Sequence, residues 1–398
     1  MSTATATLAA PRAAFREVWL VSIGHSLTHW YPATFYVLLP LIGQDLGLSY
    51  SQIGLIMTCQ FIAGAVSNVP GGMVVDSLAS KGLLLALSLF WVGFPYLLMG
   101  MSHHYWMLLL CSMLVGIGNN LWHPAAIPTL ARRFPERKGL VLSMHNMGGN
   151  VGDALAPLAV GALLGVLSWR EIVVLNLAPG VLIALVILAY LGTWSVAAHR
   201  APARTSEHVA GLLALLRDRA VAVLVTSSLF RAMTQSALLA FLPLFLAREM
   251  HYSSFAVGLC LFVLQAAGFA AAPIAGHLSD RMGRGRIVMS SMAVTVVVLV
   301  LMAVAGATPI FVLFIALLGF FLYAVRPVLQ AWLLETTPAH QGGTSIGLLF
   351  GAQALGAAIS PAVAGVLSDR YGLTAMFWFV TATIVVANLL ILLVPKER

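Results

Sequence analysis

Long apolar runs separated by short polar segments dominate the pattern of residues along this chain. Each run extends for about 20 residues without the strict alternation of a β-strand, which predicts helices long enough to cross a bilayer. The pattern predicts twelve such spans. They cover residues 18–41, 52–75, 82–101, 105–131, 139–166, 171–192, 220–246, 254–276, 286–305, 309–334, 343–367 and 373–394.

Composition supports a membrane protein. Of the 398 residues, 60% are hydrophobic and only 9% are charged, whereas soluble domains carry about 25% charged residues. These values exclude a water-soluble enzyme, a secreted protein and a single-pass receptor. The apolar runs also argue against an outer-membrane barrel, because its strands would alternate every second residue.

Positive charges are distributed unequally over the two faces of the predicted bundle. Of the 21 Lys and Arg residues, 16 fall on the face that holds both termini and three on the opposite face; the remaining two lie within spans. The positive-inside rule places both termini in the cytoplasm, as in an inner-membrane protein. Because the basic residues do not form one continuous face, the net charge of +8 does not indicate a nucleic-acid partner.

The chain repeats itself with an offset of 204 residues. Gly72 corresponds to Gly276, and Asp76 to Asp280. Since each copy has six spans, the copies are parallel, an arrangement that is common in secondary transporters. The expected organisation is an N-terminal tail (1–17), a six-helix bundle (18–192), a cytoplasmic loop (193–219), a second bundle (220–394) and a C-terminal tail (395–398).

A loop motif gives the first resemblance to a known family. Residues 276–286 read Gly-His-Leu-Ser-Asp-Arg-Met-Gly-Arg-Gly-Arg, which resembles the loop signature of the major facilitator superfamily. Residues 72–81 keep the glycine and the aspartate, and residues 365–372 form a shorter echo. The resemblance covers the whole chain. It implies an all-α polytopic membrane protein with twelve transmembrane helices in two pseudo-symmetric six-helix bundles.

Two further stretches resemble the fosmidomycin-resistance-protein branch of that superfamily. Residues 116–124 read Gly-Ile-Gly-Asn-Asn-Leu-Trp-His-Pro, and residues 144–152 read Met-His-Asn-Met-Gly-Gly-Asn-Val-Gly. The branch often has an acidic residue after His-Pro, where this chain has Ala125. This resemblance implies export of a toxic compound.

Ionisable residues within spans are costly, so each indicates a function or a partner. His25 and His29 are spaced i, i+4 and share a helix face with Tyr36. Two histidines at this spacing suit a metal ion, but we find no third matching ligand and expect no metal. We expect them to line a cavity and to titrate.

Asp153 is the only carboxylate well inside a span. His145 shares its helix face, and Asn150 lies beside it. A lone acid at this depth favours a proton site or a counter-ion to a cation. The alternative is a structural ion pair with Arg231 or Arg326.

Two arginines lie inside spans of the second half. Arg231 is accompanied by Gln235, and Arg326 occupies the position that matches His123 in the first half. A guanidinium group binds carboxylate or phosphonate in a bidentate manner, so both arginines are candidates for solute binding. The alternative for Arg326 is an ion pair with Glu335.

The loop motifs supply a second group of candidates. They lie at the cytoplasmic ends of spans, where a carboxylate can bond the first amides of a facing helix or pair with arginine. We expect them to act in gating and packing. They are Gly72, Asp76, Gly276, Asp280, Arg281, Gly283 and Arg284.

These features predict a secondary transporter that moves a small organic anion or zwitterion by alternating access, with proton-coupled export as the expected direction. The alternatives are a proton-coupled importer of an organic anion or, in a different class, a histidine-rich metal-binding membrane protein. No phosphate-binding loop is present, and we expect neither enzymatic activity nor a cofactor beyond the proton gradient. The expected partners are the solute, protons and the lipid bilayer, around a monomer.

Overall fold

The computed structural model describes residues 12–77, 80–192, 194, 215–306, 308–338 and 341–395, with side chains except at 12–14, 68–77 and 343. Nearly all of this part is helical. The helices are α1 (Arg12–Asp45), α2 (Tyr50–Ser77), α3 (Lys81–Met101), α4 (Tyr105–Arg133), α5 (Lys138–Leu163), α6 (Trp169–Leu175), α7 (Leu177–Leu191), α9 (Arg219–Arg248), α10 (Ser254–Met282), α11 (Arg284–Ala305), α12 (Phe311–Thr336), α13 (Gly342–Tyr371) and α14 (Thr374–Ile391), with a 3₁₀ turn (Pro135–Arg137) before α5.

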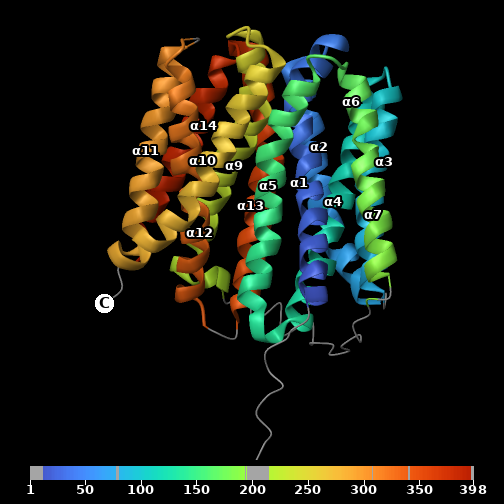
Figure 1. Cartoon of the computed structure of the whole chain (residues 1–398). Coiled ribbons are helices and arrows are strands. Elements are labelled where there is room, and N and C mark those ends of the chain that lie inside the picture. The colour runs from blue at the N-terminus through green and yellow to red at the C-terminus, as the bar shows by residue number, and fades with distance from the viewer. Residues whose placement is uncertain are drawn as a thin grey trace, which may run out of the picture.

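The helices run roughly side by side in two groups (Figure 1). Helices α1–α7 form one half and α9–α14 the other, and α5 and α13 lie near the middle of the view. We call the end at which α1 begins and α14 ends the terminal face, and the opposite end the distal face. The halves meet where α2 packs against α13 and where α5 packs against α10.

Each of the twelve predicted spans coincides with helix in the structure. Within the described residues, nine helices are long and apolar enough to cross a membrane. Helices α1, α2 and α5 have sufficient length, at 34, 28 and 26 residues, but fall outside that group of nine. His25 and His29 lower the mean hydropathy of α1, and His145 and Asp153 lower that of α5. Both of these more polar helices therefore carry candidate site residues.

The largest differences from the predicted spans are at α1, at α10, which runs to Met282 rather than residue 276, and at α6 and α7. Helix α1 begins at Arg12 rather than residue 18, because its polar start is held by an ion pair between Glu17 and Arg133 of α4 (2.6 Å). The predicted span 171–192 is divided at Asn176, whose backbone oxygen accepts a hydrogen bond from Tyr31 (3.0 Å). The outer parts of both predicted tails and most of the loop 193–219 lie outside the described residues.

Equivalent residues of the two copies make equivalent contacts between the halves. A Cβ atom at Gly54 of α2 would collide with the carbonyl oxygen of Pro361 in α13, and one at Gly258 of α10 would collide with that of Pro157 in α5. Each glycine and each proline lies 204 residues from its counterpart, as the predicted repeat requires. Small residues let backbones approach closely in membrane bundles, so the repeat preserves the residues that join the halves.

The inter-half contacts of these glycines lie toward the distal face. Gly161 near the end of α5 packs against the start of α10, where its Cβ would lie 2.7 Å from the oxygen of Ser254. Gly365 near the end of α13 likewise packs against the start of α2, where its Cβ would lie 2.5 Å from the oxygen of Tyr50. The described contacts therefore close the two halves against each other at the distal face.

Candidate functional site

Glycines of α5 bring that helix against α1. Cβ atoms at Gly148 and Gly152 would collide with the backbone oxygens of Ser22 and Ser26. The absence of side chains at these two glycines allows the close approach of the helices. Between them, Gly149 faces the α1 histidines, since its Cβ would lie 2.8 Å from the His25 ring.

Helix α4 reaches the same place through its own motif. Trp122 is fully buried, and its ring occupies the space where Gly24 lacks a side chain. Gly116 packs against the backbone oxygen of Gln60 in α2. These contacts fix the depth of α4 in the bundle and set His123, the next residue after Trp122, beside α1.

The result is a histidine cluster formed by His25, His29, His123 and His145. His25 and His123 approach through their Nε2 atoms at 3.0 Å, and the His25 Nδ1 atom lies 2.6 Å from the backbone oxygen of His145. The rings of His25 and His145 stack with centroids 3.9 Å apart. The sequence predicted the His25–His29 pair, and the structure adds two further rings to it.

Asp153 joins this cluster. Its Oδ2 atom lies 2.9 Å from the Nδ1 atom of His29, and the two side chains are 30% and 32% exposed. The structural alternative, an ion pair of Asp153 with Arg231 or Arg326, is therefore not what the structure shows: the partner is a histidine of the same half. Because both side chains stay partly exposed, the pair remains accessible.

The expectation that no third ligand accompanies His25 and His29 is wrong. One ring nitrogen each of His25, His29 and His123 lies within 4.8 Å of the others. The sequence could not show this, because His123 lies 94 residues beyond His29 and meets it only through the packing of α4 on α1.

The predicted arginines lie in the second half. Arg231 is 2% exposed and donates to Gln235 Oε1 (2.9 Å), while its Nε atom has no hydrogen-bond partner in the part of the chain that the structure describes. Arg326 is exposed and lies within electrostatic range of Arg231. The alternative pairing of Arg326 with Glu335 is not found: Glu335 binds Arg284 instead (2.8 Å).

Electrostatic interactions link the two halves at this depth. Arg326 of α12 interacts with His123 of α4. Tyr323, three residues before Arg326, interacts with Asp153 and with the buried Tyr36 of α1. The histidine cluster and the arginines thus face one polar centre from opposite halves. Sequence reasoning missed Tyr323, although its spacing of three from Arg326 places both on one helix face.

Asn150 is exposed on α5, three residues before Asp153, and among the described residues no side-chain hydrogen bond assigns it a role. It stays a prediction. In the second half, Gln353 of α13 donates to Ser228 of α9 (2.6 Å). This bond ties α13 to the helix that carries Arg231.

The loop motif of the second half forms a local network. Arg284 pairs with Asp280 at 2.6 Å and with Glu335, so it joins α10, α11 and α12 at the terminal face. Gly283 has a φ of 95°, a conformation that favours glycine. The backbone oxygen of Gly276 accepts a hydrogen bond from the Ser279 hydroxyl (2.7 Å), and Arg281 is exposed. Gly72 and Asp76 lie in α2, and the side chain of Asp76 is outside the described part of the structure.

The shorter echo of the loop motif, residues 365–372, makes the bond to helix N-terminal amides that we expected of the motifs at 72–81 and 276–286. Asp369 of α13 accepts hydrogen bonds from the backbone amides of Tyr50 and Ser51 at the start of α2, both 2.8 Å, and from the Ser51 hydroxyl. These amides have no partner within their own helix. Asp369 therefore caps a helix of the other half at the distal face.

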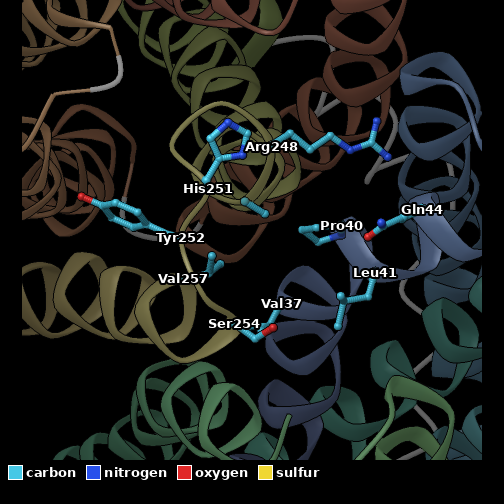
Figure 2. Close-up of a pocket in the computed structure, with 10 residues that line it drawn as sticks. Val37, Pro40, Leu41, Gln44, Arg248, His251, Tyr252, Ser254 and Val257 are labelled. Carbon is cyan, nitrogen blue, oxygen red and sulfur yellow. The ribbon is translucent and has the colours of Figure 1, made fainter. Parts of the chain in front are cut away.

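A pocket of about 410 Å³ also opens at the distal face, between α1 and the junction of α9 with α10. Figure 2 shows Pro40 and Gln44 of α1 across from Arg248 and His251. It contains none of the predicted site residues. Its place between the halves puts it beside the distal closure rather than at the polar centre.

Comparisons with known proteins agree with this architecture. The sequence profile of the Major Facilitator Superfamily matches residues 18–269 and 224–398. The phosphoglycerate transporter protein of Salmonella typhimurium is 23% identical over 396 residues, covering 92% of this chain and 85% of that protein. The fosmidomycin resistance protein of Escherichia coli is 23% identical over 402 residues, covering 99% and 96%.

Solved structures show the same fold. A bacterial homologue of the human lysosomal transporter Spinster, solved in an inward-facing and occupied conformation, superimposes with a TM-score of 0.82 at 16% identity and covers 97% of each chain. The family profile spans almost the entire sequence, and the alignments cover 85% to 97% of the length of these relatives. The chain therefore belongs to the major facilitator superfamily of membrane transporters.

Proposed function

We propose that this protein is a secondary transporter that exports a small organic anion or zwitterion across the inner membrane by alternating access, driven by the proton gradient. The observation that carries the proposal is the pair of arginines at the polar centre. Arg231 and Arg326 lie within range of each other's charge, and within the described residues neither forms an ion pair with a carboxylate. Like charges in a membrane interior need compensation, which an anionic solute would supply.

The proposed orientation places the terminal face in the cytoplasm. It rests on the distribution of Lys and Arg, of which 16 of 21 lie at that face in the predicted topology. With this orientation, the contacts that close the distal face seal the site from the outside. The ion pairs of Arg133 and Arg284 at the terminal face each join helices of one half only. Both observations favour a state that exchanges solute with the cytoplasm.

The names of the relatives support an anionic solute and leave two directions. One relative is named for phosphoglycerate, an organic anion, and another for resistance to fosmidomycin. Resistance favours export, which we propose. Import of an organic anion is the second candidate, and the arginine pair suits it equally well.

The proton gradient is the proposed energy source, and Asp153 is its candidate residue. The carboxylate meets His29 at 2.9 Å and interacts with Tyr36 and Tyr323, so it lies where both halves come together. A change in its charge would alter the balance against the arginines across the polar centre.

Transport into proteoliposomes with an imposed pH gradient tests the proposal. Organic anions would be supplied to wild-type protein, to Asp153→Asn and to Asp45→Asn, a control in which the replaced carboxylate pairs with Arg170 at the distal face. We expect gradient-driven transport in wild type and in the control, and its loss in Asp153→Asn with the protein still folded. Equal transport by all three proteins, with or without a gradient, would contradict proton coupling through Asp153.

A further inference from the structure

We propose that His25, His29 and His123 form a binding site for a divalent transition-metal ion such as Zn²⁺, with Asp153 and the backbone of His145 as supporting groups. The proposal goes beyond transport of an organic anion, and it does not depend on which ion drives that transport. It rests on the convergence of three imidazoles, on the partners of their outer nitrogens and on the accessibility of the cluster.

The spacing of the ring nitrogens is close to that of a zinc site. Ligand nitrogens at about 2.0–2.1 Å from a tetrahedral zinc ion are about 3.3–3.4 Å apart. The Nε2 atoms of His25 and His123 are already 3.0 Å apart. The widest separation within the set of three is at most 4.8 Å. Closing it requires a movement of about 1.4 Å, which side-chain rotation of His29 supplies.

The outer nitrogens of two of the three imidazoles, those of His25 and His29, are already held as metal-binding histidines require. A backbone oxygen only accepts, so the Nδ1 atom of His25 donates to His145, and the Nε2 lone pair of the neutral ring is left free to bind a metal. The Nδ1 atom of His29 faces Asp153 in the same way. A carboxylate or carbonyl behind each imidazole is the arrangement that orients histidine ligands around a metal ion.

The surroundings also suit an ion. His145 is fully buried and stacks on His25, and neither of its ring nitrogens has a hydrogen-bond partner among the described residues. Such unsatisfied buried groups are rare and often mark a place for water or an ion. His29 is 32% exposed, so an ion can enter from its side. Three protein ligands leave a fourth position of the tetrahedron open.

Binding of zinc ion alone to the full chain tests the proposal. The protein would be purified in detergent through a tag without histidine, freed of metal and titrated with Zn²⁺ by equilibrium dialysis and metal analysis. We expect one tightly bound ion per chain. His123→Ala should weaken this binding by about 100-fold or more, and Asp153→Asn by about 10- to 100-fold, as for supporting partners of metal ligands. His277→Ala, which replaces an exposed histidine of α10 outside the cluster, should leave the affinity unchanged.

X-ray absorption at the zinc edge of the loaded wild-type protein keeps the test independent of variant folding. We expect scattering from three imidazole ligands. The proposal is overturned if wild type binds no stoichiometric zinc, if His123→Ala and His277→Ala bind equally, or if the spectrum lacks imidazole scattering. Because the readout is zinc binding, its failure leaves solute transport untouched, and a failed transport assay leaves the metal site untouched.

Discussion

The cap that Asp369 places on α2 should set the balance between the two states of the transporter. Its bonds to the amides of Tyr50 and Ser51 cross from one half to the other. They exist only while the distal face is closed. Asp369→Ala removes them and leaves the two amides to water, so the closed state loses stability while the open state does not.

The expected magnitude follows from helix capping. Removing an N-terminal cap costs about 0.5–2 kcal/mol, and because Asp369 is exposed, about 1 kcal/mol is a reasonable central value. Since 1.4 kcal/mol corresponds to a factor of ten, the ratio of distal-open to distal-closed molecules should rise about 5-fold, within a range of about 2- to 30-fold.

Distance measurement between spin labels follows this ratio directly. Labels at His104 and Glu249, exposed residues at the distal ends of the two halves, would be introduced after replacing the native cysteines. We expect a larger population at long distance in Asp369→Ala. Asp45→Ala is the matched control, because its partner Arg170 lies in the same half (2.7 Å). Identical distance distributions in wild type and Asp369→Ala would refute the reasoning.

Three further changes test the packing of α5 on α1 and the loop-motif network at the terminal face. Gly149→Ala places a methyl group 2.8 Å from the His25 ring, so this variant should lose both transport and zinc binding. The control Gly139→Ala, whose methyl group meets open space, should keep both. Transport and zinc binding retained in Gly149→Ala would contradict the packing of α5 on α1. Gly283→Ala forces alanine to a φ of 95° and should cost about 1–3 kcal/mol, seen as a lower midpoint of thermal unfolding in detergent; an unchanged midpoint would count against this turn. Glu335→Gln removes one exposed partner of Arg284 and should lower the free energy of unfolding by about 1 kcal/mol at most. A larger loss of stability in the same unfolding experiment would contradict the small contribution expected of an exposed ion pair.

The sequence predicted the helices and the repeat because both depend on patterns that lie along the chain. Apolar runs fix where helices cross the membrane, and the glycines and prolines 204 residues apart identify the contacts shared by both halves. The polar start of α1 was missed because Glu17 is stabilised by Arg133 of a distant helix. An ion pair between helices leaves no mark on local hydropathy.

The sequence predicted most of the residues of the site but only some of the contacts between their side chains. His25 and His29 share a face by spacing alone, but their meeting with His123 depends on Trp122 filling the space at Gly24. Besides a proton site, the alternative for Asp153 was an ion pair with Arg231 or Arg326, because charge was the only guide. In the structure, Asp153 instead pairs with His29, because α1 packs closely against α5 and brings the two side chains together.

The central claim is that the arginine pair binds the anionic group of the solute, and matched substrates test it most directly. Proteoliposome transport would be measured for carboxylates and for their uncharged amides, with wild type, Arg231→Gln, Arg326→Gln and the control Arg248→Gln at the distal pocket. The account predicts that wild type and the control prefer the carboxylate, and that replacing either arginine of the pair removes this preference. Unchanged preference for the carboxylate in both variants would contradict it.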